Sequence, residues 1–301
     1  MDQARSDLAH LYRRAGFGAR PEELDAATRA GYEATVETLL AGTAAPDPAG
    51  DAVGVPTFAP YARRTAPPGT PAARAAQQAY RPELVALQAW WLDRMIVTST
   101  PLRERMTLLW HGHFATAISK VRDPQLMYRQ NQVFRTAGTG SFEALVQAVA
   151  KDGAMMVWLD TATDKKAHPN ENFSRELMEL FTLGVGHYSQ TDVEQAARAF
   201  TGWVYDRATD RFLVRPAQHD SGPKTFLGQT GDLSGEDVVS IIVRQPASAR
   251  FVTAKVWSHL AYPVTPADPV VTQLLPAYTS GYRIDDLLRA TFLHPAFRSP
   301  T

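Results

Sequence analysis

Apolar residues recur at helical spacing along most of the chain. Between residues 83 and 97, Leu84, Leu87 and Trp91 lie three or four positions apart, which places them on one face of a helix. The same spacing predicts helices within the first forty residues and over residues 101–114, 123–136, 141–151, 172–184, 192–202, 234–244, 247–261, 268–277 and 283–292. The pattern therefore predicts a mainly α protein, a globular bundle of many helices.

Two stretches break this helical pattern. Residues 203–215 alternate two short apolar runs with a polar turn, which predicts one small β-hairpin. Residues 43–82 carry eight prolines among many alanines and glycines, which is typical of a linker or a surface loop. We therefore expect an N-terminal helical segment (1–42), a linker or loop (43–82) and a main helical domain (83–301). The main domain carries the candidate site, either on its own or continuous with residues 1–42.

The composition excludes several functional classes. Thirty-one basic residues balance thirty-one acidic ones, and zero net charge argues against a nucleic-acid partner. No stretch approaches the roughly 18 to 20 apolar residues of a membrane span. No apolar run follows Arg13-Arg14, so we expect neither a membrane span nor a leader in this chain. Cysteine is absent, which excludes thiolate-bound cofactors; any metal must be held by nitrogen and oxygen ligands.

Eight histidines could supply such ligands, and two of them form a His-x-His pair. On a helix over residues 101–114, His113 falls on the apolar face with Met106 and Trp110. His111 falls on the opposite side unless the backbone breaks at Gly112. A buried imidazole needs a partner, so His113 is either a core histidine bonded to a carbonyl or carboxylate, or a metal ligand.

A glutamate lies within an apolar helix face further along the chain. On a helical wheel for residues 172–184, Glu176 falls between Leu180 and Leu183, and Glu179 lies at the edge of that sector. An unpaired buried carboxylate is costly, so Glu176 should be protonated, paired or bound to a metal. Its partner is either an arginine or His113. The arginines available to it are Arg129, Arg135 and Arg198.

Two polar turns carry further candidates. His187 and Tyr188 follow Gly184 and Gly186 on a predicted loop. Residues 219–228 form a polar turn after the hairpin, in which His219, with Asp220 and Lys224, could act as a ligand, a base or a phosphate contact. A solvated turn explains the same residues equally simply.

Several of these motifs occur together in a large bacterial family. They are Leu11-Tyr-Arg-Arg-Ala-Gly-Phe-Gly18, Trp110-His-Gly-His-Phe114, His168-Pro-Asn-Glu-Asn172, Arg175-Glu-Leu-Met-Glu-Leu-Phe-Thr-Leu-Gly184, Ala199-Phe-Thr-Gly-Trp203 and His219-Asp-Ser-Gly-Pro-Lys224. The chain thus resembles the family known as domain of unknown function 1800. Members are often exported, frequently with twin-arginine leaders, and many continue beyond the position where this chain stops. The resemblance implies an extracytoplasmic role. It also implies that the chain is a shortened member of the family or a fragment of one.

The sequence supports three hypotheses about function. The first is a metal-dependent enzyme with His111, His113 and Glu176 as ligands to iron, zinc or manganese, acting by redox or hydrolytic chemistry. His219 would be a further ligand or catalytic group, Lys224 a catalytic group, and Glu179, Asn170 and Asn172 would orient the ligands. The substrate would be a small molecule or an extracytoplasmic polymer.

The second hypothesis is a metal-free hydrolase, for example of a glycan. Glu176 would be its general acid, with Glu179 or Asp192 as its partner. The third is a non-catalytic scaffold or interaction protein, in which His113 and Glu176 pair in the core. The sequence leaves the substrate, the oligomeric state and the compartment open.

Overall fold

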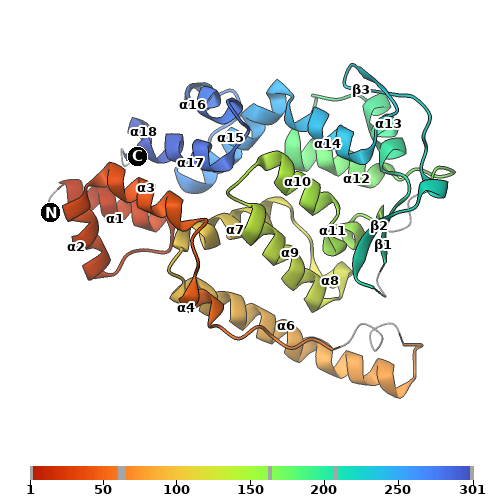
Figure 1. The fold of residues 1–301 in the computed structure, drawn as a ribbon, viewed down its shortest axis with the longest axis horizontal. Helices are drawn as coiled ribbons and strands as arrows, with labels where there is room; N and C mark the ends of the chain where they lie inside the picture. The colour runs from red at the N-terminus through yellow and green to blue at the C-terminus, as the bar shows by residue number, and fades with distance from the viewer. Residues whose placement is uncertain (1–2, 60–65, 162–164, 207–208, 299–301) are drawn as a thin grey trace.

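The computed structural model describes residues 3–59, 66–161, 165–206 and 209–298, and this part of the chain is mainly helical, as the sequence predicts (Figure 1). The helices of the first part are α1 (Gln3–Ala15), α2 (Pro21–Ala30), α3 (Tyr32–Gly42), α4 (Pro48–Asp51), α6 (Pro71–Val97), α7 (Pro101–His113), α8 (Ile118–Val121), α9 (Pro124–Ala137), α10 (Phe142–Ala150), α11 (Gly153–Trp158) and α12 (Glu171–Glu176). The π-helical segment η2 (Leu177–Thr182) continues α12. Then follow α13 (Gln190–Phe200), the 3₁₀ turn η3 (Pro216–Gln218), α14 (Gly235–Val243), α15 (Pro246–Leu260), α16 (Pro269–Thr279), α17 (Ile284–Leu293) and α18 (Pro295–Arg298).

Two antiparallel hairpins interrupt the helices. The predicted one is confirmed: β1 (Trp203–Asp206) pairs with β2 (Arg211–Val214). The second, β3 (Lys224–Phe226) with β4 (Gln229–Gly231), lies where the sequence predicts only a polar turn. Its two turn residues, Leu227 and Gly228, have φ of 45° and 80°, the positive values that a two-residue hairpin turn requires. Asp192 Oδ1 accepts the Leu227 N–H at 2.9 Å and supports this unusual leucine conformation.

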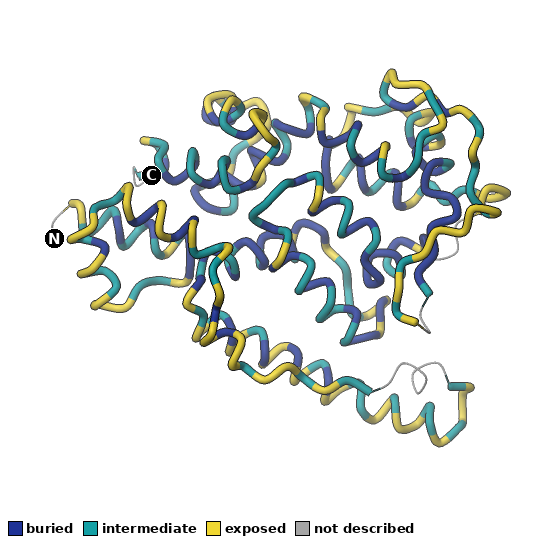
Figure 2. Tube along the Cα trace, viewed as in Figure 1, coloured by how far each residue is buried: buried dark blue, intermediate teal, exposed yellow. Residues whose placement is uncertain are grey.

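The first and last helices of the chain lie side by side (Figure 1). The Tyr32 hydroxyl donates to the Phe292 carbonyl at 3.0 Å, and Arg289 pairs with Glu37 at 2.8 Å. One hydrophobic core takes in residues from α1 through to α18, and buried segments run through the middle of the body (Figure 2). Residues 3–42 are therefore packed on the C-terminal helices by both polar and apolar contacts.

The proline-rich stretch is only partly a loop. Residues 71–82 belong to α6, so the prediction of a linker or loop is wrong there, and Pro82 lies inside the helix. A proline removes one helical hydrogen bond, but the alanines and glutamines before it are strong helix formers. Ala59 is held against that helix, since Glu83 accepts the Ala59 N–H at 2.7 Å.

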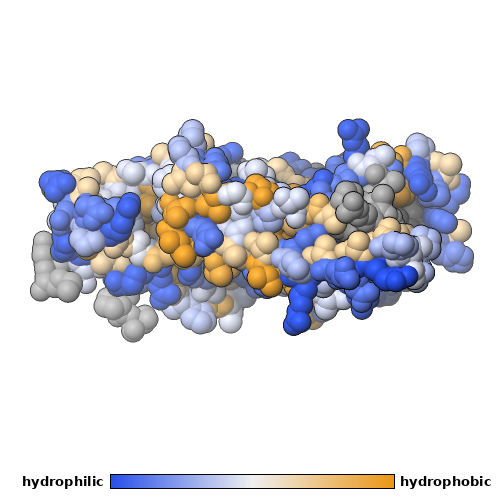
Figure 3. All heavy atoms as spheres, turned by 90° about the horizontal axis from the view of Figure 1, so that it is seen from below, coloured by the Kyte–Doolittle hydropathy of each residue, from blue (hydrophilic) through white to orange (hydrophobic). Residues whose placement is uncertain are grey.

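Helix α6 runs along the lower edge of the molecule in Figure 1 and leaves apolar side chains exposed. They are Val85, Leu92, Ile96 and Val97, and apolar atoms gather on the face that Figure 3 shows. Within the part of the chain that the structure describes, no helix is both long and apolar enough to cross a membrane.

Candidate functional site

His113 is a buried, neutral histidine in an aromatic cluster. It lies at the end of α7, where its ring contacts Phe114, Phe181 and Phe251 at centroid distances of 4.6 to 6.1 Å. Its Nε2 lies 2.9 Å from the Phe181 carbonyl oxygen; because a carbonyl only accepts, Nε2 carries the proton. Burial lowers the pKa of His113 to about 3. The unprotonated Nδ1 is buried and has no hydrogen-bond partner among the described residues.

Glu176 and Glu179 lie at the junction of α12 and η2, and both are half-buried. Burial and the nearby Glu179 carboxylate raise the pKa of Glu176. Glu179 accepts a 2.5 Å hydrogen bond from the Tyr188 hydroxyl. Among the described contacts, no hydrogen bond or ion pair joins Glu176 to His113 or to any of the arginines considered for it. Glu176 is thus a half-buried carboxyl group with a raised pKa.

The π-helical turn explains why the helical wheel misplaced Leu180. A wheel drawn at 100° per residue puts Leu180 in the apolar sector, yet Leu180 is 53% exposed. In η2, each turn holds more residues, so Met178 and Thr182 are buried instead. The prediction that Leu180 belongs to the apolar face is therefore wrong, whereas Glu176 is half-buried.

The residues after the first hairpin form internal polar contacts. His219 Nδ1 lies 2.8 Å from the Thr201 carbonyl, and Asp220 pairs with Arg198 at 2.7 Å. The Arg198 hydrogen bond lowers the pKa of Asp220 to about 2. Lys224 is buried and donates to the Gly222 carbonyl and to Asp232 at 3.1 and 3.2 Å. These residues stabilise the turn and the second hairpin.

The predicted metal ligands are spread over separate contacts. Asn170 and Asn172 donate to the carbonyl of Leu159 rather than to a histidine or glutamate. In the described ranges, no three His, Asp or Glu side chains lie close enough together to hold a metal ion. Metal binding at His111, His113 and Glu176 stays a prediction.

His111 lies in the wall of a different feature, a cavity of about 390 Å³. The cavity opens between α6, α7, α8 and α9, and its lining is mainly apolar. The lining residues are Leu84, Leu87, Gln88, Trp90, Trp91, His111, Thr116, Ala117, Ile118, Met127 and Asn131. We call it the His111 pocket. Cavities of this size with few polar groups are typical of small-molecule sites.

The described side-chain contacts of the His111 imidazole are with aromatic rings. It contacts Trp91 edge-on at a centroid distance of 5.0 Å, and Phe134 at 6.4 Å. No hydrogen bond to it occurs within the described part of the chain. Burial lowers the pKa of His111, so the ring is neutral at pH 7 and one nitrogen is available as a proton acceptor.

Asn131 is the polar group of the pocket that sequence reasoning missed. It is only 4% exposed, and neither its side-chain oxygen nor its nitrogen has a hydrogen-bond partner among the described residues. Leaving a buried polar group unpaired costs about 1–3 kcal/mol. A signal was present in the sequence, because Asn131 shares one helix face with Met127 and Phe134. A buried asparagine on an apolar helix face, like a buried glutamate, indicates a polar group that needs a partner.

A buried ion network supports the tryptophans of the pocket. Glu104 is fully buried; it accepts from Trp91 Nε1 at 3.2 Å and from both Arg94 and Arg135 at 2.6–2.9 Å. The Arg135 guanidinium also lies 5.2 Å from the ring centroid of Trp90. Hydrogen bonds with the two arginines outweigh burial and lower the pKa of Glu104. These buried ion pairs thus fix the positions of Trp90 and Trp91 in the wall of the pocket.

Fold and cavities together define a mainly helical protein with ligand-sized space between its helices. The model of the family described as a protein of unknown function, DUF1800, matches residues 10–301, and the chain belongs to that family. The resemblance carried by the sequence motifs is confirmed. No curated protein and no solved structure matches the chain. Since the family description names no activity, function must be argued from the site.

Proposed function

We propose that the chain binds a small, largely apolar molecule in the His111 pocket and that His111 accepts a proton from it. The observation that carries this proposal is Asn131, a buried amide with no partner beside an apolar cavity of about 390 Å³. A bound molecule would satisfy both polar atoms of Asn131 while it covers apolar wall. The new hydrogen bonds and the burial of apolar surface would each be favourable by themselves.

The chemistry of the walls indicates the ligand. Leu84, Leu87 and Met127 suit an aliphatic or aromatic body. The Asn131 amide offers one acceptor and two donor hydrogens, and its best complement is a carboxamide or a carboxylic acid. His111, neutral and unpaired, stands in the same wall and would act as a general base toward such a group. An enzyme of small apolar amides, esters or acids fits these features.

A pair of matched compounds tests the proposal. Benzamide and toluene share a ring, but only benzamide can pair with Asn131. We expect benzamide to bind about tenfold more tightly in titration calorimetry, which corresponds to about 1.4 kcal/mol. In Asn131→Leu, which keeps the size of the side chain and removes the unpaired amide, the preference should reverse. Gln125→Leu, on the same helix outside the pocket, should leave it unchanged.

An unchanged preference in Asn131→Leu would contradict the proposal. His111→Phe separates binding from chemistry, because it should retain benzamide binding and lose any turnover. His187→Phe, on an exposed loop, is its matched control.

Glu176 favours a second candidate, the metal-free hydrolase. Its raised pKa and its lack of a described partner suit a general acid, with Glu179 held nearby by Tyr188. Screening glycans and esters with Glu176→Gln as the paired variant tests this candidate. Activity that survives in a folded Glu176→Gln protein would rule it out.

The metal-dependent enzyme stays a third proposal, supported only by the His-x-His pair and the cysteine-free composition. Elemental analysis of the protein, of His113→Ala and of Glu176→Ala decides it. Stoichiometric metal that is lost in both variants would support it. A folded protein that stays metal-free after iron, zinc and manganese are supplied would exclude it.

A further inference from the structure

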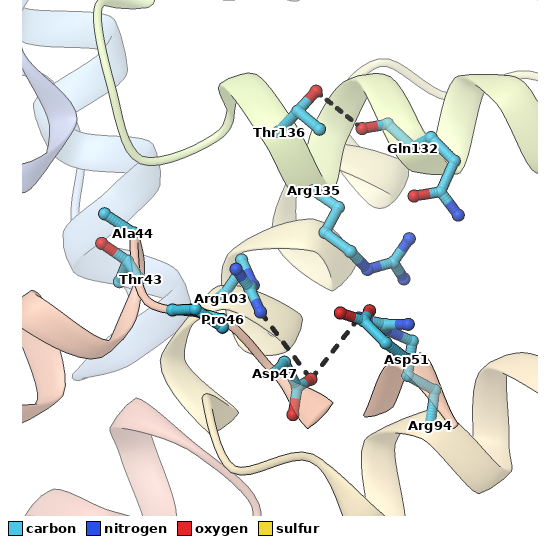
Figure 4. A pocket seen from close by; sticks show the side chains of 10 residues that line it. All are labelled: Thr43, Ala44, Pro46, Asp47, Asp51, Arg94, Arg103, Gln132, Arg135 and Thr136. Atoms are coloured by element: carbon cyan, nitrogen blue, oxygen red, sulfur yellow. Dashed lines mark hydrogen bonds and ion pairs between the residues drawn. The ribbon is translucent and has the colours of Figure 1, made fainter. Parts of the chain in front are cut away.

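A second cavity, of about 370 Å³, lies where residues 43–51 meet α6, α7 and α9 (Figure 4). Three arginines line it: Arg94, Arg103 and Arg135, each from a different helix. Figure 4 shows the Arg135 guanidinium reaching from α9 toward Asp51 and Arg94 across the cavity. None of the residues in its lining belongs to the His111 pocket. We call it the arginine cavity.

The buried carboxylates at this cavity have all the donors they can use. Asp47 accepts hydrogen bonds from the Thr98 hydroxyl, the Ser99 N–H and hydroxyl, and the Gly50 N–H at 2.7–3.1 Å. Burial alone would raise the pKa of Asp47, but these hydrogen bonds lower it to about 2. Glu104 accepts from Trp91, Arg94 and Arg135. Asp47 Oδ2 also lies 3.4 Å from Arg94 Nη2 and 3.7 Å from Arg103 Nη2, so both carboxylates are already fully engaged.

The arginines nevertheless have donors left over. Arg135 donates hydrogen bonds from Nε and Nη2 to Glu104. Its Nη1 is buried without a partner in the described structure, and the residue is only 6% exposed. Arg103 gives Nη1 to the Ala45 carbonyl, and its Nε is likewise buried and unpaired. Buried guanidinium N–H groups are normally bonded, so these orphaned donors indicate a missing acceptor.

One carboxylate at the rim is only loosely committed. Asp51 pairs with Arg94 at 2.8 Å, but its side chain is 65% exposed. Arg94 is buried, but solvation of the exposed Asp51 carboxylate weakens this pair. Asp51 can therefore turn outward into solvent when a stronger anion arrives, and Arg94 then gains a free donor.

We propose that the arginine cavity binds an oxyanion group, phosphate or carboxylate, carried by a small molecule. Arg135 Nη1 and Arg103 Nε would donate to it, and the Gln132 amide in the same wall would add further donors. Arginine forks match the paired oxygens of these groups. This proposal stands apart from the His111 pocket, because its donors and lining residues are different.

The test uses inorganic phosphate and acetate as probes on the whole chain. Both are titrated at constant ionic strength against sodium chloride, and binding is followed by nitrogen-edited NMR and by thermal unfolding. We expect saturable shifts in the amides of residues 43–47 and 132–136, with a rise in Tm that follows occupancy. Phosphate binding without acetate binding assigns a phosphorylated ligand, and the reverse assigns a carboxylate.

Variants separate the site from general ion effects. Arg135→Lys keeps the positive charge but loses the guanidinium fork, and we expect the dissociation constant to rise at least tenfold. Arg103→Lys and Gln132→Leu should weaken binding to a smaller extent, and they carry the test if Arg135→Lys does not fold. Asp51→Asn should tighten binding. Arg289→Lys, an exposed arginine paired with Glu37, is the matched control and should have no effect.

Two results would overturn the proposal. The first is a response to both anions that does not differ from the response to chloride. The second is saturable binding that keeps its affinity in folded Arg135→Lys, Arg103→Lys and Gln132→Leu proteins.

Discussion

Three buried polar residues near α7 and α9 differ in how well their hydrogen-bonding capacity is met. Glu104 accepts bonds from three side chains, His113 has one partner at the Phe181 carbonyl, and Asn131 has none among the described residues. Satisfied buried groups stabilise a fold, whereas unsatisfied ones cost free energy. Glu104 therefore contributes to stability, and the ligand that we propose for the His111 pocket would give Asn131 its hydrogen-bond partners.

His113 should make the protein less stable in mild acid. Its pKa is about 3 in the folded protein and about 6.5 when unfolded, so below pH 6.5 only the unfolded chain takes up the proton. Stability is retained above pH 6.5 and falls as the pH drops. Between pH 7.5 and 5.5 the loss is about 1.4 kcal/mol. Other titrating groups change stability in both proteins, so urea unfolding at both pH values should show this loss as the difference between the unmodified protein and His113→Phe.

His259, whose pKa burial lowers to about 4, adds a loss of the same sign in both proteins. The quantity to compare is therefore the change in unfolding free energy per pH unit in the unmodified protein and in His113→Phe. His187→Phe, at an exposed loop position, should keep the full slope of the unmodified protein. Equal slopes in His113→Phe and the unmodified protein would contradict the buried, neutral histidine.

At the scale of single elements, local chemistry decides where helices begin, and packing decides their pitch. Proline begins α7 and α9, and the Asp152 and Ser189 side chains cap α11 and α13. These signals are readable from the sequence. The switch from α12 to the π-helical η2 has no such signal, and it changes which side chains face the core.

The π-helical turn predicts opposite outcomes for two neighbouring residues. Leu180→Lys should change the free energy of unfolding by less than about 0.5 kcal/mol, because the side chain is exposed. Met178→Ala should cost about 2–5 kcal/mol, because Met178 is fully buried. Urea denaturation measures both. If Leu180→Lys were the more damaging change, the segment would be an ordinary α-helix.

Asp152, the cap of α11, should titrate near neutrality. Burial raises its pKa to about 7, although hydrogen bonds from the Met155 N–H and the Gln130 amide oppose this. The protonated acid stabilises the fold fully below about pH 4, the pKa of an unfolded aspartate, and this contribution is lost as the pH rises to about 7.

The expected slope for this group is a loss of about 1 kcal/mol per pH unit between pH 5 and 7. Asp152→Asn, which resembles the protonated acid, should remove that loss in urea titrations, whereas Glu236→Gln at the surface should retain it. A slope that is the same in Asp152→Asn would show that Asp152 ionises normally.

At the scale of the whole molecule, buried charges tie distant segments together. Arg94 on α6, Glu104 on α7 and Arg135 on α9 form one network, and Arg94 also donates to the Gly50 carbonyl at 2.9 Å. The same network borders both cavities: Trp91 lines the His111 pocket, and Arg135 lines the arginine cavity. Ligands at the two sites would therefore act on shared side chains.

Glu104→Gln should be the most damaging single change at the network. It leaves two buried arginines without their carboxylate, a loss of about 3–5 kcal/mol. Thermal and urea unfolding measure it. Glu37→Gln breaks an exposed pair with Arg289 and should cost less than about 1 kcal/mol. Equal effects in the two variants would show that the network contributes little to stability.

The sequence by itself determined the helical class, most of the helix limits, the hairpin over 203–215 and the family. These depend on residues close together in the chain: apolar spacing, prolines, caps and short motifs. Residues 71–82 were misread because their prolines outweighed the alanines in the prediction, although Pro71 begins the helix and only Pro82 lies in its interior.

Only the tertiary structure decided which polar residues share a site. The Nε2 of His113 met the Phe181 carbonyl in η2 rather than Glu176, and the π-helical turn changed which of the following side chains face the core. Asn131 came to face Trp90 and Trp91 from a helix some forty residues away, and Arg103 and Arg135 converged on residues 43–51. Such contacts arise from how helices cross, and helix crossing depends on the volumes of all packed side chains together.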